Sequence, residues 1–515
     1  MALIFISTHK YKIGFLVLLF LSAFHILSTF PHLDEYYYRA DEGAYFRQIE
    51  TVKDHGLDGL KEIAERFISN KTEQVSPNPL RIGHILLGIV FLSFHNAISS
   101  LSYLSLLSFI ILCSCIFIFF SKLTEERTAF IISALLIFSP LAGGMARRAL
   151  TDSEYYLFIS ISLFFFISFI KNPNGRNLCI FIVSFITCCL IREVSFFMLP
   201  FFTMYLLWRK YISNIRIKLI HIVTVTLIPP FVVSIIYISL YGGIMNVKNI
   251  IHIMFTAHNE YIIYGSGPWY QYFLDYFILS PFTSIFFFFF IGIYIVTDRK
   301  KIYVNIILLT VPYFIIIYSF LPKDVRYVIN IDLAYRIGAA IAIIYLSSVI
   351  VKKSNMRNIV TAIFLVLLLG FDVKAFDKIF IDGRVYDPIA FNLLLQEKII
   401  PEYSVASKVE IDSTTSKEVD KYCRVVFENP SPENFLNLGL LFYNEKKYQE
   451  SIRASSFAIN MKPDFAEAYN NIAAAYGQLQ MYNEEIKACE KALLLNPDFQ
   501  LAKNNLEWAK SQLKK

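Results

Sequence analysis

The chain has 515 residues, of which 56% are hydrophobic and only 17% are charged, and its mean hydropathy is +0.51. Soluble domains carry about 25% charged residues, so this composition excludes an ordinary soluble protein and predicts an all-α, multi-spanning membrane protein. The formal net charge of +7 does not indicate a nucleic-acid partner. Much of the excess positive charge lies in short loops between apolar runs, where basic residues set orientation.

The first apolar run, near residues 13–30, follows Lys10 and Lys12 and has no small-residue cleavage site after it. We therefore interpret it as an uncleaved first helix. A hydrocarbon core of about 30 Å needs about 20 apolar residues per helix. Further runs close to this length recur at 82–98, 101–121, 129–145, 155–170, 177–191, 194–208, 218–240, 276–297, 302–320, 333–351 and 358–372.

Two kinds of loop alternate between these runs. Basic loops occur at 121–127, 171–176, 208–218, 298–301 and 352–357, and loops with mixed charges and aromatics at 147–156, 192–193, 241–275 and 322–327. Basic loops favour the cytoplasm. A cytoplasmic amino terminus agrees with this pattern only if 82–98 does not cross the bilayer. We therefore predict about eleven spans in a plasma membrane, a juxtamembrane helix at 82–98 and an extracytoplasmic carboxyl-terminal region.

The sequence beyond Lys374 is polar and contains a period of 34 residues, since 437–469 aligns with 471–503. The pattern resembles the tetratricopeptide repeat, a pair of antiparallel helices. We expect a membrane domain at 1–373, a linker with some helix at 374–430 and a small α-helical repeat domain at 431–515. The repeats either stabilise the fold as a cap or bind a protein partner.

The mixed loops bring carboxylates and cations to one side of the membrane. Their charged residues are Asp41, Glu42, Arg147, Arg148, Asp152, Arg192, Glu193, Lys323 and Arg326. This set suits transfer from a phosphorylated lipid, because a carboxylate can take a proton from an acceptor while cations bind the leaving phosphate. The charges cluster in loops and not mid-span, which disfavours a transporter. No metal-ligand spacing occurs among the Cys and His residues.

Several motifs resemble the GT-C glycosyltransferases, which use polyprenyl-phosphate sugars and include protein O-mannosyltransferases and lipid A aminoarabinose transferases. DEGAYFRQIE, at 41–50, is similar to the Asp-Glu motif of their first outer loop. Other similar segments follow in the same order over residues 10–350: SPNPLRIGHILLGIV, RRALTDSEYYLF, IREVSFFMLP, GPWYQYFLDYFILSP and PKDVRYVINI. The His-Pro-Pro version of the first of these is absent.

The resemblance implies roles for particular residues. Asp41 would be the general base, and Glu42 would orient it or, with Asp152, hold a divalent metal; family members without a metal exist, so this stays open. The donor phosphate would be bound by Arg192, Lys323, Arg326 and Arg148, with Arg147 as an alternative to Arg148. Tyr45 and Tyr327 would line the substrate site, whereas Trp269 is more typical of a core or an interface.

These features predict an inverting hexosyl- or pentosyltransferase. It would move a sugar from a polyprenyl-phosphate donor to a protein, lipid or glycan on the extracytoplasmic face. Two alternatives stay open. One is an oligosaccharide ligase or polymerase with a diphosphate-linked donor, and the other is a non-enzymatic scaffold that recruits partners through its repeats.

Overall fold

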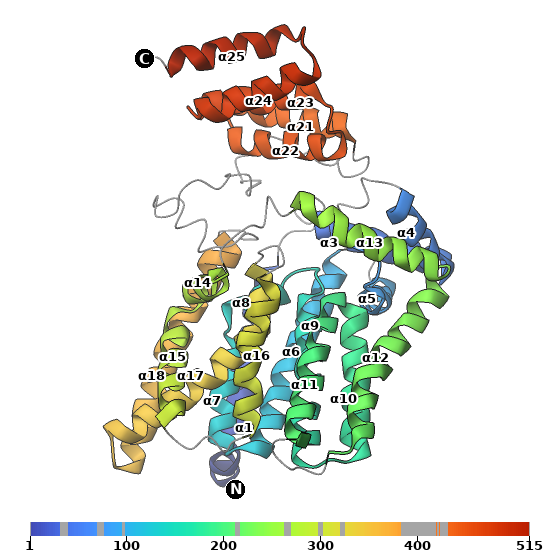
Figure 1. Ribbon diagram of the computed structural model, residues 1–515. Coiled ribbons are helices and arrows are strands. Elements are labelled where there is room, and N and C mark those ends of the chain that lie inside the picture. The colour runs from blue at the N-terminus through green and yellow to red at the C-terminus, as the bar shows by residue number, and fades with distance from the viewer. Residues whose placement is uncertain are drawn as a thin grey trace.

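The computed structural model describes residues 2–30, 40–69, 77–94, 98–211, 217–261, 269–296, 302–319, 325–382, 419, 422 and 431–513. Every regular element in these ranges is helical (Figure 1), which confirms the predicted fold class. The α-helices of the membrane domain are α1 (Ala2–Ser28), α3 (Ala40–His55), α4 (Asp58–Ser69), α5 (Ile82–Phe94), α6 (Ser99–Leu123), α7 (Glu126–Ile137), α8 (Pro140–Ala146), α9 (Asp152–Lys171), α10 (Gly175–Ile191), α11 (Met198–Tyr211), α12 (Leu219–Leu240), α13 (Ile244–Tyr261), α14 (Gln271–Leu279), α15 (Pro281–Val296), α16 (Ile302–Tyr318), α17 (Ile329–Ile350) and α18 (Ser354–Phe376).

Three short elements of other helical types complete this domain. They are the 3-10 helices η2 (Glu193–Phe197) and η3 (Val325–Val328) and the π-helix η4 (Asp377–Asp382). Because α18 and η4 extend to Asp382, helical structure continues past the predicted domain boundary at residue 373. Most of the predicted linker lies outside the described residues.

Six described helices are long and apolar enough to cross a membrane: α1, α6, α9, α12, α17 and α18. The pair α7 and α8 makes a seventh if its two halves, which are bent by 59°, form one broken span. The sequence predicts one continuous helix there, but Ser139 interrupts it by capping α8 ahead of Pro140. The shorter apolar helices do not reach this length, so the count of eleven spans stays a prediction.

The apolar run at 82–98 forms α5, which has only 13 residues. At 1.5 Å per residue it extends about 20 Å, too short to cross a core of about 30 Å. Figure 1 shows α5 nearly end-on, whereas the long helices run from top to bottom. This agrees with a juxtamembrane helix. The predicted outer loop at 241–275 differs from expectation, because it contains the helices α13 and α14.

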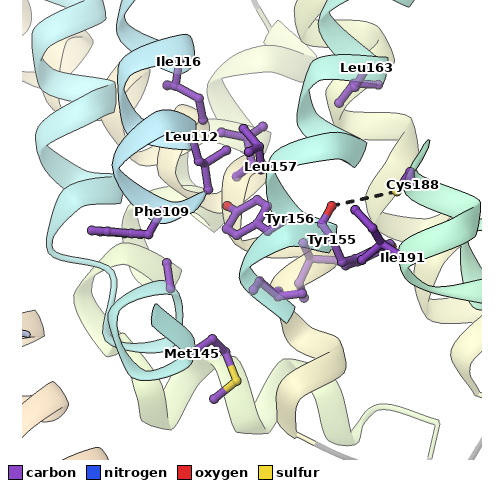
Figure 2. Close-up of a cluster of buried hydrophobic side chains, with 14 of the residues drawn as sticks. Phe109, Leu112, Ile116, Met145, Tyr155, Tyr156, Leu157, Leu163, Cys188 and Ile191 are labelled. Carbon is purple, nitrogen blue, oxygen red and sulfur yellow. Dashed lines mark hydrogen bonds between the residues drawn. The ribbon is translucent and has the colours of Figure 1, made fainter. Parts of the chain in front are cut away.

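Two glycines let α5 pack closely between its neighbours. A Cβ at Gly88 would lie 2.4 Å from Cδ1 of Ile49 on α3, and one at Gly83 would lie 2.9 Å from Cγ1 of Ile191 at the end of α10. Beside this contact, α6, α9 and α10 share a core of buried aliphatic and aromatic side chains (Figure 2). The ends of α3, α5, α9 and α10 are therefore held together.

The repeat region consists of α21 (Pro432–Asn444), α22 (Tyr448–Met461), α23 (Ala466–Gln478), α24 (Tyr482–Leu495) and α25 (Gln500–Gln512). α23, α24 and α25 each begin 34 residues after their counterparts α21, α22 and α23, so the predicted period is confirmed. The turns repeat as well, because Lys446 and Gln480 adopt positive φ angles of 63° and 61°. A Cβ at Gly439 would meet Oγ of Ser455 at 2.5 Å, which shows how closely α21 and α22 pack.

Candidate active site

Four arginines and four carboxylates converge where α3, α5 and α9 begin and α10 ends. These residues lie at the helix ends, in the turn at 147–151 and on the 3-10 helices η2 and η3. They form four pairs: Asp41–Arg326, Glu42–Arg148, Asp152–Arg192 and Glu193–Arg81. Each charge is thus neutralised locally, which lowers the cost of removing it from water.

The Asp41–Arg326 pair is the most accessible of the four. Asp41 lies in the first turn of α3, and its Oδ2 accepts a hydrogen bond of 3.0 Å from Nη1 of Arg326 on η3. The Asp41 side chain is 38% exposed and that of Arg326 is 17% exposed. Asp41 can therefore reach a bound molecule without first breaking open the protein core.

Glu42 is fully buried beside Asp41. Its Oε1 accepts hydrogen bonds from Nε of Arg148 and, at 3.3 Å, from the backbone N–H of Ala149. Its other oxygen, Oε2, is buried and has no hydrogen-bond partner among the described residues. Glu42 thus joins the start of α3 to the turn before α9 and retains one acceptor.

Arg192 is buried between two tyrosine rings. Its guanidinium carbon lies 5.4 Å from the ring centroid of Tyr155 and 5.1 Å from that of Tyr327. Nη1 donates to Asp152, whereas Nε is buried without a hydrogen-bond partner among the described residues. Stacking and an ion pair therefore fix the guanidinium while one donor stays available.

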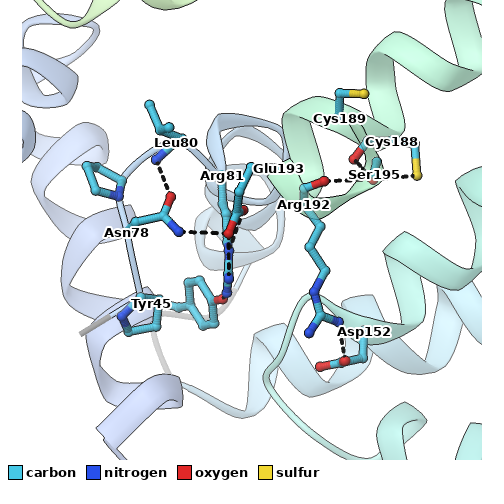
Figure 3. Close-up of polar contacts among 12 residues, drawn as sticks. Tyr45, Asn78, Leu80, Arg81, Asp152, Cys188, Cys189, Arg192, Glu193 and Ser195 are labelled. Atoms are coloured by element: carbon cyan, nitrogen blue, oxygen red, sulfur yellow. Dashed lines mark hydrogen bonds and ion pairs between the residues drawn. The ribbon is translucent and has the colours of Figure 1, made fainter. Parts of the chain in front are cut away.

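Arg81 and Glu193 form a bidentate pair, with two N–O distances of 3.0 Å (Figure 3). Asn78 also donates to Glu193 at 2.8 Å, and Arg81 donates to the Tyr45 hydroxyl. Burial alone would raise the pKa of the Glu193 carboxyl, but the charge and hydrogen bonds of Arg81, together with Asn78, lower it to about 2. Burial also raises the pKa of Tyr45, which stays a neutral phenol. The predicted substrate-lining residue Tyr45 is thus held in the wall of the site.

A buried histidine–glutamate pair lies next to Tyr45. Nδ1 of His84 on α5 lies 3.3 Å from Oε1 of Glu154 on α9, and both side chains are fully buried. The His84 ring also meets the Tyr45 ring edge-on, with a centroid distance of 4.7 Å. This pair could not be predicted from the sequence, because nothing in the one-dimensional pattern distinguishes a buried His or Glu from a loop residue.

Two other residues considered from the sequence, Arg147 and Trp269, lie away from these four pairs, and a third is not described. Arg147 donates to the backbone oxygens of Phe380 and Thr29, so it joins η4 to the end of α1. Trp269 is 63% exposed on the chain just before α14. Lys323 lies outside the described residues.

The carboxylates predicted for a metal do not form a suitable ligand set. Glu42 and Asp152 are each bonded to an arginine, so a divalent cation between them would lie beside two positive guanidinium groups. Within the described ranges, no group of three or more His, Cys, Asp or Glu residues could hold a metal ion. The described residues of the site therefore do not fit a metal, and we derive no step through one.

A second ionic network joins the membrane helices α17 and α18, and none of its charged residues was predicted as a site residue. Arg336 on α17 bonds to Asp332, at 3.0 Å, and to Asp372 on α18. All three side chains are at most 3% exposed. Asp332 also accepts hydrogen bonds from Ser139, Tyr156 and Tyr276. The spacing DLAYR at 332–336 places Asp and Arg one helical turn apart, which is the signal that could have identified the pair.

Comparison with known proteins agrees with the resemblance found in the motifs. The family model for dolichyl-phosphate-mannose-protein mannosyltransferases matches residues 82–237, and a tetratricopeptide-repeat model matches residues 466–499. No curated protein matches the sequence. The chain therefore resembles the GT-C glycosyltransferases in part of its membrane domain and carries a tetratricopeptide repeat near its carboxyl end.

Two solved structures match the chain, and the first of them has a TM-score above 0.5. One is the apo Archaeoglobus fulgidus oligosaccharyltransferase, with a TM-score of 0.51, 10% identity, and coverage of 90% of this chain and 72% of that one. The other is ArnT from Cupriavidus metallidurans bound to undecaprenyl phosphate, with a TM-score of 0.44, 12% identity, and coverage of 94% and 80%. At these identities the likeness concerns the fold alone.

Proposed function

We propose that this protein is an inverting glycosyltransferase that moves a hexose or pentose from a polyprenyl-phosphate donor to an acceptor outside the cytoplasm. The observation that carries the proposal is the convergence of four arginine–carboxylate pairs, of which Asp41–Arg326 is the most exposed. The family-model match over residues 82–237 supports a membrane enzyme with a lipid-linked donor.

In the proposed reaction, the Asp41 carboxylate takes the proton from an acceptor hydroxyl or amide. The freed acceptor atom forms a bond to C1 of the sugar from the side opposite the phosphate. The bond between C1 and the phosphate oxygen breaks, and polyprenyl phosphate leaves with the electron pair. Arg326 and Nε of Arg192, which has no hydrogen-bond partner among the described residues, stabilise the negative charge on the phosphate. Attack from the opposite side inverts the configuration at C1.

An apolar cavity beside the site supports a lipid donor. It is lined by residues of α9, α11, α16 and α17: Tyr156, Ile159, Ser160, Leu163, Met198, Phe202, Ile307, Thr310, Phe314, Ile329, Asn330, Leu333 and Ala334. Asn330 accepts a hydrogen bond from Tyr155, whose ring stacks on Arg192. Through Asn330 and Tyr155, the cavity thus adjoins the proposed phosphate site.

The test is sugar transfer by purified protein in lipid nanodiscs, followed as release of polyprenyl phosphate. Asp41→Asn should reduce the rate at least about 100-fold, because the general base is lost. Asp54→Asn, an exposed carboxylate on the same helix, is the matched control and should keep the wild-type rate. Full activity in a well-folded Asp41→Asn protein would contradict the assignment of the base.

The same assay separates the alternatives. An oligosaccharide ligase would release polyprenyl diphosphate from a diphosphate-linked donor. A scaffold would release neither product, and changes at Asp41, Asp152 and Arg326 would leave its biological function intact while changes near Asn437 and Asn471 abolished it. We assign the repeats the role of binding a protein acceptor or partner.

The proposed orientation has a separate test with a membrane-impermeant thiol reagent on intact cells. Cysteines introduced at Asp54 and Glu484 should react, because we place α3 and the repeats outside. The native Cys179 is exposed at the start of α10, after a basic loop, and should stay unlabelled in intact cells. Labelling of Cys179 together with protection of Glu484→Cys would reverse the orientation.

A further inference from the structure

Two neighbouring helices at the active-site end of the molecule expose faces of opposite character. The first is α4, which buries Leu60, Ile63 and Phe67 and exposes charged residues. These exposed side chains form ion pairs with each other and with α3, such as Lys61–Glu65 and His55–Glu62. This is the usual pattern of a helix that faces water.

The second helix, α13, shows the reverse pattern. Val247 and Ile250 are buried, but Ile244 and Phe255 are 69% and 67% exposed. Among residues 244–255, the part of the helix whose side chains the structure describes, the exposed residues are Ile244, Met245, Lys248, Ile251, His252 and Phe255. Their spacing of 1, 3, 4 and 7 residues places them on one face, with Lys248 near its middle. α13 thus presents a largely apolar stripe that carries Lys248 and His252.

The stripe follows, after a short turn, a helix whose exposed side is also apolar. α12 is one of the six helices able to cross the membrane, and its outer side exposes Leu227, Phe231 and Ile235. The two helices are separated by Tyr241, Gly242 and Gly243, and both glycines adopt positive φ angles, of 80° and 113°. This sharp turn sends α13 across the ends of the membrane helices (Figure 1), at a steep angle to α12.

From this continuity we propose that α13 lies in the plane of the membrane, with its apolar stripe among the acyl chains and Lys248 at the phosphates of anionic lipids. An apolar stripe beside one charged residue is typical of interfacial helices. A lysine in such a stripe can extend its alkyl stem and place its ammonium group at the headgroups. α4 packs on the other side of α13 and turns its charges to water.

This contact determines the depth of the active site relative to the bilayer. α13 packs against α4, and α4 packs against α3, which carries Asp41 and Glu42. The tight contact between α3 and α4 is visible at Gly59, where a Cβ would lie 2.7 Å from the backbone oxygen of Thr51. A lipid-anchored α13 would therefore hold the site at the level of the lipid phosphates.

The test uses spin labels on the full chain in nanodiscs, with the exposed Cys179 and also Cys423 replaced by serine. A label at Phe255→Cys should collide with oxygen, which dissolves in the membrane, at least about five times as often as with a water-soluble nickel chelate. The matched label at Glu62→Cys on α4 should show the opposite preference. Equal access of the chelate to both positions would overturn the proposal, and this readout is independent of enzyme activity.

A second measurement tests the role of Lys248. Phosphatidylglycerol should draw the Phe255→Cys label deeper than it lies in discs of phosphatidylcholine alone, and Lys248→Gln should abolish this difference. The Lys53→Gln control, on the exposed end of α3, should retain it. If the difference survives in Lys248→Gln, the lysine does not contact the anionic headgroup and that part of the proposal fails.

Discussion

The membrane domain contains two buried networks of arginines and carboxylates, and they differ in how completely their hydrogen bonds are satisfied. In the inner network, formed by Arg336, Asp332 and Asp372, Asp332 accepts four hydrogen bonds and both carboxylates contact Arg336. The outer network consists of the four arginine–carboxylate pairs of the candidate active site. In it, Asp41 is partly exposed, and Oε2 of Glu42 and Nε of Arg192 have no partner among the described residues. A buried network whose donors and acceptors all have partners stabilises the fold, whereas a network with unsatisfied donors and acceptors can bind a ligand.

The largest predicted effect on stability comes from breaking the inner network. Arg336→Met removes the shared cation and leaves Asp332 and Asp372 buried without it. We expect a loss of about 3–5 kcal/mol in the free energy of unfolding, because an unpaired buried charge is costly. Thermal unfolding of the detergent-solubilised protein measures this loss. A melting temperature equal to that of the wild type would show that the inner network is not needed for stability.

The outer network should respond in the opposite way. Arg326→Met removes a partly exposed pair, so the free energy of unfolding should change by no more than about 1 kcal/mol. Sugar transfer should fall about 100-fold, because the donor phosphate loses a cation. Lys353→Met, an exposed cation at the start of α18, is the control for general charge loss and should leave transfer unchanged. Normal transfer by Arg326→Met would remove this arginine from the phosphate site.

The Arg81–Glu193 pair sharpens the comparison, because it belongs to the outer network but is mostly buried. The pKa of Glu193 is lowered from 4.5 to about 2, so the pair stabilises the fold above pH 4.5 and loses this effect as the pH falls towards 2. Glu193→Gln should cost roughly 3 kcal/mol at pH 7. The difference from the wild type should shrink below pH 4.5 in thermal unfolding. A difference that is independent of pH would contradict the ion-pair explanation.

The smallest effect concerns a buried carboxylate outside both networks. Glu485 on α24 lies against Gly477 on α23, and burial raises the pKa of its carboxyl to about 7. Ionisation therefore opposes folding, and the stability of the repeats should fall as the pH rises from 4.5 to 7. Glu485→Gln should stabilise the repeats by about 1–2 kcal/mol at pH 8 and little at pH 4.5. Hydrogen exchange of α23 and α24 in the full chain measures the change.

The sequence predicts well those features that depend on local pattern. Apolar length and the 34-residue period identified the membrane helices and the repeats. The resemblance to the GT-C motifs and the charges of the mixed loops pointed to Asp41 and Arg326, whose roles stay predictions. Which arginine pairs with which carboxylate could not be predicted, because each pair joins residues far apart in the chain. The partners of Asp41 and Arg81 lie 285 and 112 residues away.

Features set by tertiary contacts alone were missed. Asp372 looks like an ordinary charge near a helix end, and only the approach of α17 to α18 makes it a partner of Arg336. The break at Ser139 was also missed, since the surrounding run is apolar throughout. α13 was interpreted as a loop because its polar residues are mixed with apolar ones, and its exposed stripe becomes evident only when its packing on α4 is known.

The position of Arg147 determines where the chain can be cut. Its guanidinium bonds to the backbone oxygen of Phe380, and Phe380 and Phe376 pack against Gly144 and Gly143 on α8. A truncation at residue 373, the boundary expected from composition, would delete both aromatic rings and one of the two backbone acceptors of the buried Arg147. The neighbouring residue, Arg148, holds Glu42. A catalytic fragment made without the repeats should therefore end after Asp382, so that the last turn of the scaffold stays attached.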